Sequence, residues 1–261
     1  APSDDVPLAW FAAYTPDRVH SLDRSALSID DAPELREIDV ALNVSEEHYV
    51  GAIARIKQLI ASGDTYQVNY TTRARFEAEV DPVAYFLAMI RSHPVPYGAY
   101  INLGEAQVLS ISPELFLRRR GDLLLSKPMK GTRARGRTPD EDEALAEDLV
   151  TAVKDRAENL MIVDMVRNDI GRASRIGSVH VPALFEAEKY RTVWQMTTTV
   201  TGEAREDASL GDIFAATFPG ASITGAPKHR TMEIIRELEP DPRGVYCGAL
   251  GLLMPDSRDF T

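Results

Sequence analysis

Residues 139–169 limit the possible folds more than any other segment, because they carry a long, continuous helical pattern. The pattern fits one long helix or two helices separated by a break, and its acidic start suits the positive end of a helix. Shorter helices are predicted at 45–63, 81–92, 212–218 and 232–238. Strand-like segments lie between these helices, and the interleaving of helices with antiparallel strands predicts an α+β fold.

The first clear strand pattern follows Thr65, where apolar and polar side chains alternate. Its polar side carries Gln67, Asn69 and Thr71, which either face solvent or line a pocket. Further strands are expected at 8–11, 108–111, 115–119, 190–201 and 245–253. The rest of residues 1–44 is predicted to be a connector.

The charge and the apolar runs of the chain exclude several classes of protein. The 261 residues carry a net charge of −11, from 29 lysines and arginines against 40 aspartates and glutamates. An acidic chain without a basic block is poorly suited to nucleic acid, whose phosphates it would repel. No apolar run approaches the roughly 18 residues that a membrane helix needs. We therefore expect neither nucleic acid nor a membrane as a partner.

The single cysteine, Cys247, cannot form an intrachain disulfide. It lies in an apolar run and is expected to be a buried strand thiol, not a reactive group. The N-terminal residues lack the basic and apolar regions of a signal peptide. Together these features predict a reducing compartment, the cytoplasm.

Lys130 is the first candidate for chemistry, because it lies in a tight Gly-Thr turn at 128–132. A lysine buried at such a turn can lose its proton and act as a nucleophile. Upstream, Glu114 supplies a carboxyl group, and a carboxyl group held near a nucleophile can act as a general acid.

Two carboxylates, Asp155 and Glu158, are three residues apart on the long helical pattern and therefore share a face of the helix. Ile162 and Met165 continue that face, which predicts that it points inward. Inward carboxylates need a cation, and a hard ion such as Mg²⁺ suits oxygen ligands. The alternative is an exposed face on which neighbouring basic side chains pair with the two carboxylates.

The segment 218–228 combines glycines and hydroxyl side chains and leads into a predicted helix, at whose start Pro227 lies. Free N–H groups at a helix start can bind an anion such as a carboxylate, although an ordinary helix-entry loop has the same composition. The five histidines have no metal-ligand spacing, and each is expected to be a surface or core residue.

Taken together, several of these segments resemble the chorismate-utilising enzymes. The matching segments are 63–69, 112–114, 128–132, 157–164, 167–169 and 222–228. The resemblance implies a two-sheet chorismate-binding fold with flanking helices and a Mg²⁺-dependent site. It also implies that 45–261 is the catalytic domain, without its C-terminal end, and that 1–44 is a remnant of an N-terminal subdomain and a connector.

Two positions distinguish the branches of this family. Isochorismate and salicylate synthases carry a lysine at the position of Gln67, where it activates water; anthranilate and isochorismate synthases carry an alanine at the position of Lys130. The resemblance therefore implies the aminodeoxychorismate synthase branch, which serves folate biosynthesis. The alternatives are anthranilate synthase component I and a non-catalytic chorismate-binding fragment.

In the mechanism that this branch implies, Lys130 attacks chorismate C2 while Glu114 protonates the departing C4 hydroxyl. Ammonia from a glutamine amidotransferase partner then adds at C4 and expels the lysine. Glu158 and Asp155 match the metal-binding carboxylates of the family. The residues implied to line the substrate site are Gln67, Gly131, Thr132, Gln195, Ser222, Thr224 and Gly225.

The sequence departs from the family pattern at two places. Gln195 stands where many relatives have a catalytic histidine, and an amide cannot titrate. The sequence stops at Thr261, where the family continues with a substrate-binding strand and a second metal-binding glutamate. We therefore expect residues 1–261 alone to be inactive.

Overall fold

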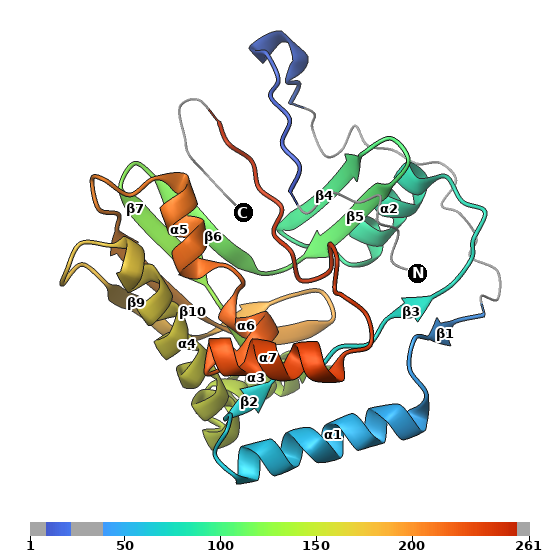
Figure 1. Ribbon diagram of the computed structural model, residues 1–261, viewed down its shortest axis with the longest axis vertical. Coiled ribbons are helices and arrows are strands. Elements are labelled where there is room, and N and C mark those ends of the chain that lie inside the picture. Colours follow the sequence, from blue (N-terminus) through green and yellow to red (C-terminus); the bar gives the residue numbers. More distant parts are fainter. Residues whose placement is uncertain (1–8, 22–38, 255–261) are drawn as a thin grey trace.

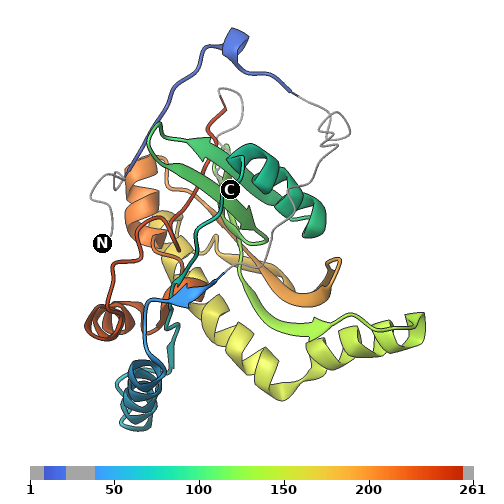
Figure 2. The ribbon, with the colours of Figure 1, turned by 90° about the vertical axis from the view of Figure 1, so that its right-hand side faces the viewer.

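The structure is a computed structural model, and it describes residues 9–21 and 39–254 (Figures 1 and 2). The helices are η1 (Pro16–Arg18), α1 (Glu46–Ala61), α2 (Pro82–Ser92), α3 (Pro139–Thr151), α4 (Val153–Ala173), α5 (Leu210–Thr217), α6 (Ala221–Thr224) and α7 (Lys228–Leu238). The shorter strands are β1 (Ala41–Leu42), β2 (Gln67–Val68), β3 (Ala74–Arg75) and β11 (Gly225–Ala226). The longer strands are β4 (Tyr97–Asn102), β5 (Gln107–Ser112), β6 (Leu115–Arg120), β7 (Leu123–Lys127), β8 (Met129–Ala134), β9 (His180–Lys189) and β10 (Val193–Glu203). The mixture confirms the predicted α+β class.

The main sheet is antiparallel and is centred on β10. Along one edge of β10, β8 pairs with its N-terminal half and β7 with its C-terminal half. Pro128 separates β7 from β8, and its carbonyl accepts a hydrogen bond from the backbone N–H of Thr198. The other edge of β10 pairs with β9, and β6 pairs with β7 at the outside of the sheet. This arrangement places the Lys130 segment directly beside β10.

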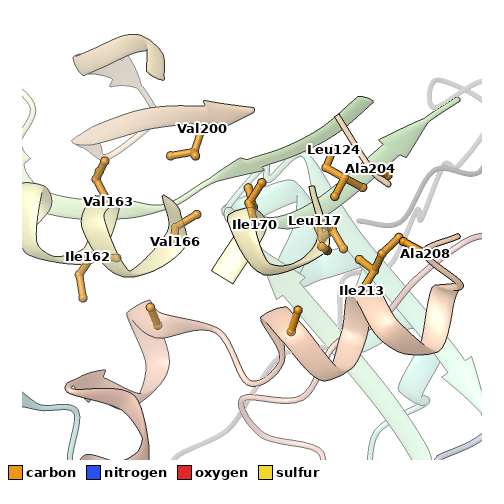
Figure 3. Packing of buried hydrophobic residues seen from close by; sticks show 13 residues of the cluster. Leu117, Leu124, Ile162, Val163, Val166, Ile170, Val200, Ala204, Ala208 and Ile213 are labelled. Carbon is orange, nitrogen blue, oxygen red and sulfur yellow. The ribbon is translucent and has the colours of Figure 1, made fainter. Parts of the chain in front are cut away.

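The hydrophobic core lies between this sheet and the helices α4 and α5 (Figure 3). Leu117, Leu124 and Val200 come from the sheet, whereas Ile162 and Ile213 come from the helices, and all five are almost completely buried. Complete burial of such a side chain stabilises the fold by about 1.5–3 kcal/mol. The core therefore fixes α4 against β8 and β10, which carry candidate site residues.

Two smaller units flank the main sheet. The β4–β5 hairpin packs against α2 (Figure 1). On another side, Ile56 and Leu59 of α1 pack with Ile234 of α7. The short strands β2 and β11 pair there, so that the segment after α1 lies beside the segment before α7. None of the helices within the described ranges is long and apolar enough to cross a membrane.

The helix predictions are confirmed, including the cap at Ser45. The Ser45 hydroxyl accepts a hydrogen bond from the backbone N–H of His48 at the start of α1, and Thr138 caps the acidic first turn of α3 in the same way. The long pattern at 139–169 proves to be two helices, because Ala152 leaves the helical conformation with φ −59° and ψ 120°. Pro227 directly precedes α7, as predicted.

Some strand predictions are wrong. The strand after Thr65 shortens to β2, because only Gln67 and Val68 find strand partners, in β11. Residues 244–247 form a turn and 248–253 have no regular secondary structure; Cys247 has φ +62°, which an extended strand does not allow. This thiol is therefore only half-buried and is not in a strand. Residues 9–11 are not in a strand either, and Phe11 is 84% exposed; residue 8 lies outside the described ranges.

Candidate active site

Lys130 lies on β8, where its side chain is partly buried. Its Nζ donates a hydrogen bond to the backbone oxygen of Ser222, at 2.9 Å. The backbone oxygen of Lys130 accepts a hydrogen bond from Asn159 Nδ2, at 3.4 Å, and Asn159 is completely buried on α4. The lysine is thus held from both ends, by α6 through its amine and by α4 through its backbone.

Glu114 lies in the turn between β5 and β6 and also contacts Ser222. The Ser222 hydroxyl donates to Glu114 Oε1 at 2.6 Å, so one serine joins the two candidate catalytic groups. Burial raises the pKa of Glu114, although the Ser222 hydrogen bond, the charge of Lys130 and the backbone N–H of Met129 oppose this effect. A carboxyl group with a raised pKa keeps its proton closer to neutral pH, as a general acid requires.

A small pocket of about 20 Å³ adjoins Glu114. Its polar lining includes Glu114, Ser126, Asp169 and Ser222. Burial raises the pKa of Asp169, but this carboxylate is also paired with Lys228. Because Asp169 neutralises Lys228, this lysine offers no free positive charge to an anion. The anion site predicted in the 218–228 segment would therefore have to rely on backbone N–H groups.

Gly131 and Thr132 follow Lys130 on β8. Gly131 has φ +102°, and a Cβ atom there would lie 3.1 Å from Leu149 Cδ1 and from Met196 Cε. Thr132 is opposite Gln195 in the β8–β10 register, and its hydroxyl donates to Gln195 Oε1 at 2.9 Å. Gly131 and Thr132 therefore adjoin Lys130, and Thr132 and Gln195 form a polar pair across the two strands.

The other predicted substrate residues lie where β2 meets β11. Gly225 has φ +133°, and a Cβ atom there would lie 2.1 Å from the backbone oxygen of Gln67. Thr224 is buried, and its hydroxyl donates to the backbone oxygen of Gly220 at 3.0 Å, within the turn. Gln67 Oε1 is buried without a hydrogen-bond partner. Gln67 therefore keeps a free acceptor, whereas the hydroxyl of Thr224 is already used.

The predicted metal carboxylates differ in their surroundings. Asp155 Oδ2 pairs with Arg133 Nη2 at 2.8 Å, whereas Glu158 is 41% exposed and its ion-pair partner, Lys154, is 3.9 Å away. The most buried residue of this turn is Asn159. Within residues 9–21 and 39–254, no three histidine, cysteine or acidic side chains come together as a metal site. The described residues thus do not form a complete Mg²⁺ site, and Arg133 already neutralises Asp155.

Sequence reasoning missed several residues beside the candidate site. Lys127 and Glu188 form an ion pair, and Tyr190 donates to Glu188 Oε2 at 3.3 Å and to the Pro113 oxygen at 3.4 Å. Burial, together with Glu188, raises the pKa of Tyr190 to about 12. The cluster joins Lys127 of β7 and the turn at Pro113 to the end of β9, which are far apart in the sequence, so no local spacing could have indicated it.

The family model described as chorismate binding enzyme matches residues 15–261. This chain belongs to that family. Among curated relatives, the chain is 46% identical to aminodeoxychorismate synthase of Streptomyces griseus, over 93% of this chain and 34% of the relative. It is 42% identical to an anthranilate synthase component 1 of Haloarcula marismortui, over 94% of this chain and 52% of the relative.

Among solved structures, anthranilate synthase component I from Streptococcus pneumoniae matches with a TM-score of 0.79 and 30% sequence identity. The match covers 95% of this chain and 52% of that structure. It confirms the predicted chorismate-binding fold. The chain spans between about a third and a half of the length of these three proteins.

Proposed function

We propose that the protein is component I of an aminodeoxychorismate synthase and converts chorismate and ammonia to 4-amino-4-deoxychorismate. The observation that carries the proposal is the bridge through Ser222, which contacts Lys130 Nζ at 2.9 Å and Glu114 Oε1 at 2.6 Å. A potential nucleophile and a carboxyl group with a raised pKa are thereby both held by Ser222, and Glu114 and Ser222 also line a small pocket.

In the proposed reaction, the neutral amine of Lys130 forms a bond to chorismate C2, the ring double bond shifts, and the C4–oxygen bond breaks. Glu114 gives its proton to the departing hydroxyl, which leaves as water. Ammonia then attacks C4, the bond between Lys130 and C2 breaks, and a proton of the new ammonium group returns to Glu114. The covalent intermediate divides one difficult substitution into two easier steps.

Mg²⁺ and an ammonia-supplying glutamine amidotransferase remain proposals. The name "component 1" of a Bacillus subtilis relative, 46% identical over 79% of this chain, supports a partner subunit. Glu158 has no close ion-pair partner and is the carboxylate most available to a metal ion. When bound, Mg²⁺ would offset the negative charge of the substrate carboxylates.

Anthranilate synthase is the second candidate, because one relative with that name is 42% identical over 94% of this chain. Lys130 argues against it, since a nucleophilic amine at this position is what the covalent route requires. Gln67 argues against isochorismate and salicylate synthase, which activate water at this position, because an amide cannot act as a base.

The proposal is tested on the full-length protein that contains this chain. Chorismate, Mg²⁺ and excess ammonium salt are incubated with it, and the products are identified by chromatography and mass spectrometry. We expect 4-amino-4-deoxychorismate. Anthranilate or isochorismate as the only product would contradict the branch assignment, and chorismate binding without turnover would support a non-catalytic role.

A further inference from the structure

We infer that Arg243, together with its partner Glu239, is a positioning residue that holds α6 so that Ser222 reaches both Lys130 and Glu114. The inference rests on the proposed function, because it explains how the two groups of that site are kept in place. Arg243 lies beyond α7 and was not among the candidate residues that the sequence indicated.

Arg243 makes short hydrogen bonds to two separate backbone segments. Its Nη1 donates to the Ile223 oxygen and its Nη2 donates to the Asn69 oxygen, both at 2.6 Å. Glu239 accepts from Nε at 2.9 Å and from Nη2 at 2.7 Å. The side chains of Arg243 and Glu239 are only 15% and 5% exposed. Disruption of a buried, hydrogen-bonded ion pair of this kind destabilises the structure much more than disruption of a surface pair does.

The same network includes the segment that follows β2. The backbone N–H of Asn69 donates to the Thr224 oxygen at 2.9 Å, and Asn69 Nδ2 donates to the Ile223 oxygen at 3.3 Å. Thr71 donates to Glu239 through its backbone N–H and its hydroxyl, at 2.9 and 3.0 Å. The carbonyl groups directly after Ser222 are thus held by Arg243 and Asn69 together.

The α6 turn needs such support because it has only four residues, too few to be stable as an isolated helix. Ser222 must present its backbone oxygen to Lys130 and its hydroxyl to Glu114 at the same time. A displacement of about 1 Å would break the second contact and can cost about 100-fold in rate. Because the Ile223 oxygen accepts a hydrogen bond from Arg243, loss of this hydrogen bond would allow the neighbouring Ser222 to move.

A loss of the Ser222 contact also predicts a change in pH dependence. The groups around Glu114 are Lys130 on β8, Tyr190 after β9, the Ser222 hydroxyl and Asp169, which lines the same pocket. The Ser222 hydrogen bond favours the charged carboxylate, so its loss raises the pKa of Glu114 further. Since the general acid must be protonated, the alkaline limb of the kcat profile would move to higher pH.

The test compares Arg243→Lys with Arg75→Lys in the full-length protein. Lysine keeps the charge but lacks the planar fork that reaches two carbonyl groups. Arg75 is a matched control, because it pairs with Asp241 and is 52% exposed. We expect Arg243→Lys to lower kcat for chorismate consumption about 10- to 100-fold, with KM changed less, and to move the alkaline limb upward. Arg75→Lys should change neither.

A double-mutant cycle with Ser222→Ala tests whether Arg243 acts through Ser222. Ser222→Ala removes the hydroxyl that contacts Glu114 but keeps the backbone oxygen that contacts Lys130. In this background, Arg243→Lys should therefore no longer move the alkaline limb, and it should lower kcat by a smaller factor than it does alone. An unshifted pH profile, or effects that multiply independently, would mean that Arg243 only stabilises the fold.

A readout without turnover separates this inference from the proposed function. Hydrogen exchange of the 221–226 amides should accelerate in Arg243→Lys and not in Arg75→Lys. Unchanged exchange would overturn the inference whatever product the enzyme makes. Conversely, another product with accelerated exchange would contradict the aminodeoxychorismate assignment and leave the positioning role standing.

Discussion

At the scale of single residues, Ser222 decides how Lys130 and Glu114 can cooperate. Neither group contacts the other through a direct hydrogen bond in the described structure; each contacts the same serine. Ser222 lies far from both in the sequence, so its bridging position depends on how α6 packs against α4 and α7.

Removal of the amine of Lys130 should abolish the covalent route. We expect Lys130→Ala to lower the rate of 4-amino-4-deoxychorismate formation by orders of magnitude, because no other group would attack C2. Lys57→Ala is a suitable control, since Lys57 is exposed on α1. Product formation followed by chromatography checks the prediction, and an unaffected rate in Lys130→Ala would refute the nucleophile assignment.

The raised pKa of Glu114 predicts how stability depends on pH. Because folding raises this pKa, the protonated group favours the folded state below the unfolded value of about 4.3, and this contribution is lost as pH rises through the folded pKa. Glu114→Gln cannot ionise, so its free energy of unfolding should improve relative to the unmodified protein as pH rises. Urea unfolding at several pH values measures this difference, and a difference independent of pH would contradict the prediction.

At the scale of secondary-structure elements, close approach of backbones fixes the substrate segment. The β2–β11 pair brings the Gln67 oxygen so near to Gly225 that a side chain cannot fit. The break at Ala152 similarly lets α3 and α4 lie against the sheet as separate helices. Both features place site residues, and neither depends on a local helix or strand preference.

Gly225→Ala should destabilise the protein by more than about 2 kcal/mol, because φ +133° and the 2.1 Å contact both oppose a Cβ atom. Gly51→Ala is the matched control: it lies within α1 and a Cβ atom there meets nothing within 4 Å. We expect Gly51→Ala to stabilise by about 0.5–1 kcal/mol. Equal effects of the two substitutions on urea unfolding would refute this account.

At the scale of the whole molecule, the network of Arg243 joins the chain after β2, the α6 turn and the end of α7. The main sheet and α4 hold Lys130 from the other side. The candidate site therefore forms where distant parts of the chain meet, which is typical of a site that depends on the complete fold.

Metal dependence is expected for the full-length protein. Chelation should abolish activity, and Mg²⁺ should restore it. Glu158→Gln should raise the Mg²⁺ concentration needed for half-maximal activity, because Glu158 lacks a close ion-pair partner. Asp164→Asn on the same helix is the control, since Asp164 is 78% exposed and paired with Arg167. Equal Mg²⁺ requirements in the two variants would contradict the role given to Glu158.

The sequence by itself determined the longer helices, because capping residues such as Ser45 and periodic apolar residues are local signals. It did not indicate the short helices η1 and α6. It also determined the family and the candidate pair of Lys130 and Glu114, through short motifs. The division of the chain at residue 45 and the roles of the site residues stay predictions.

Only the tertiary structure decided which segments pair and which side chains meet. Residues 245–253 look like a strand, yet a strand needs a neighbour for its hydrogen bonds, and none of the described strands pairs with them. β9 was missed, although it covers one edge of β10. Asn159 and Arg243 were missed because they act by donating hydrogen bonds to backbone carbonyl groups that are distant in the sequence. Local pattern encodes the conformation of a segment, whereas a site built from several segments depends on long-range contacts that no local pattern contains.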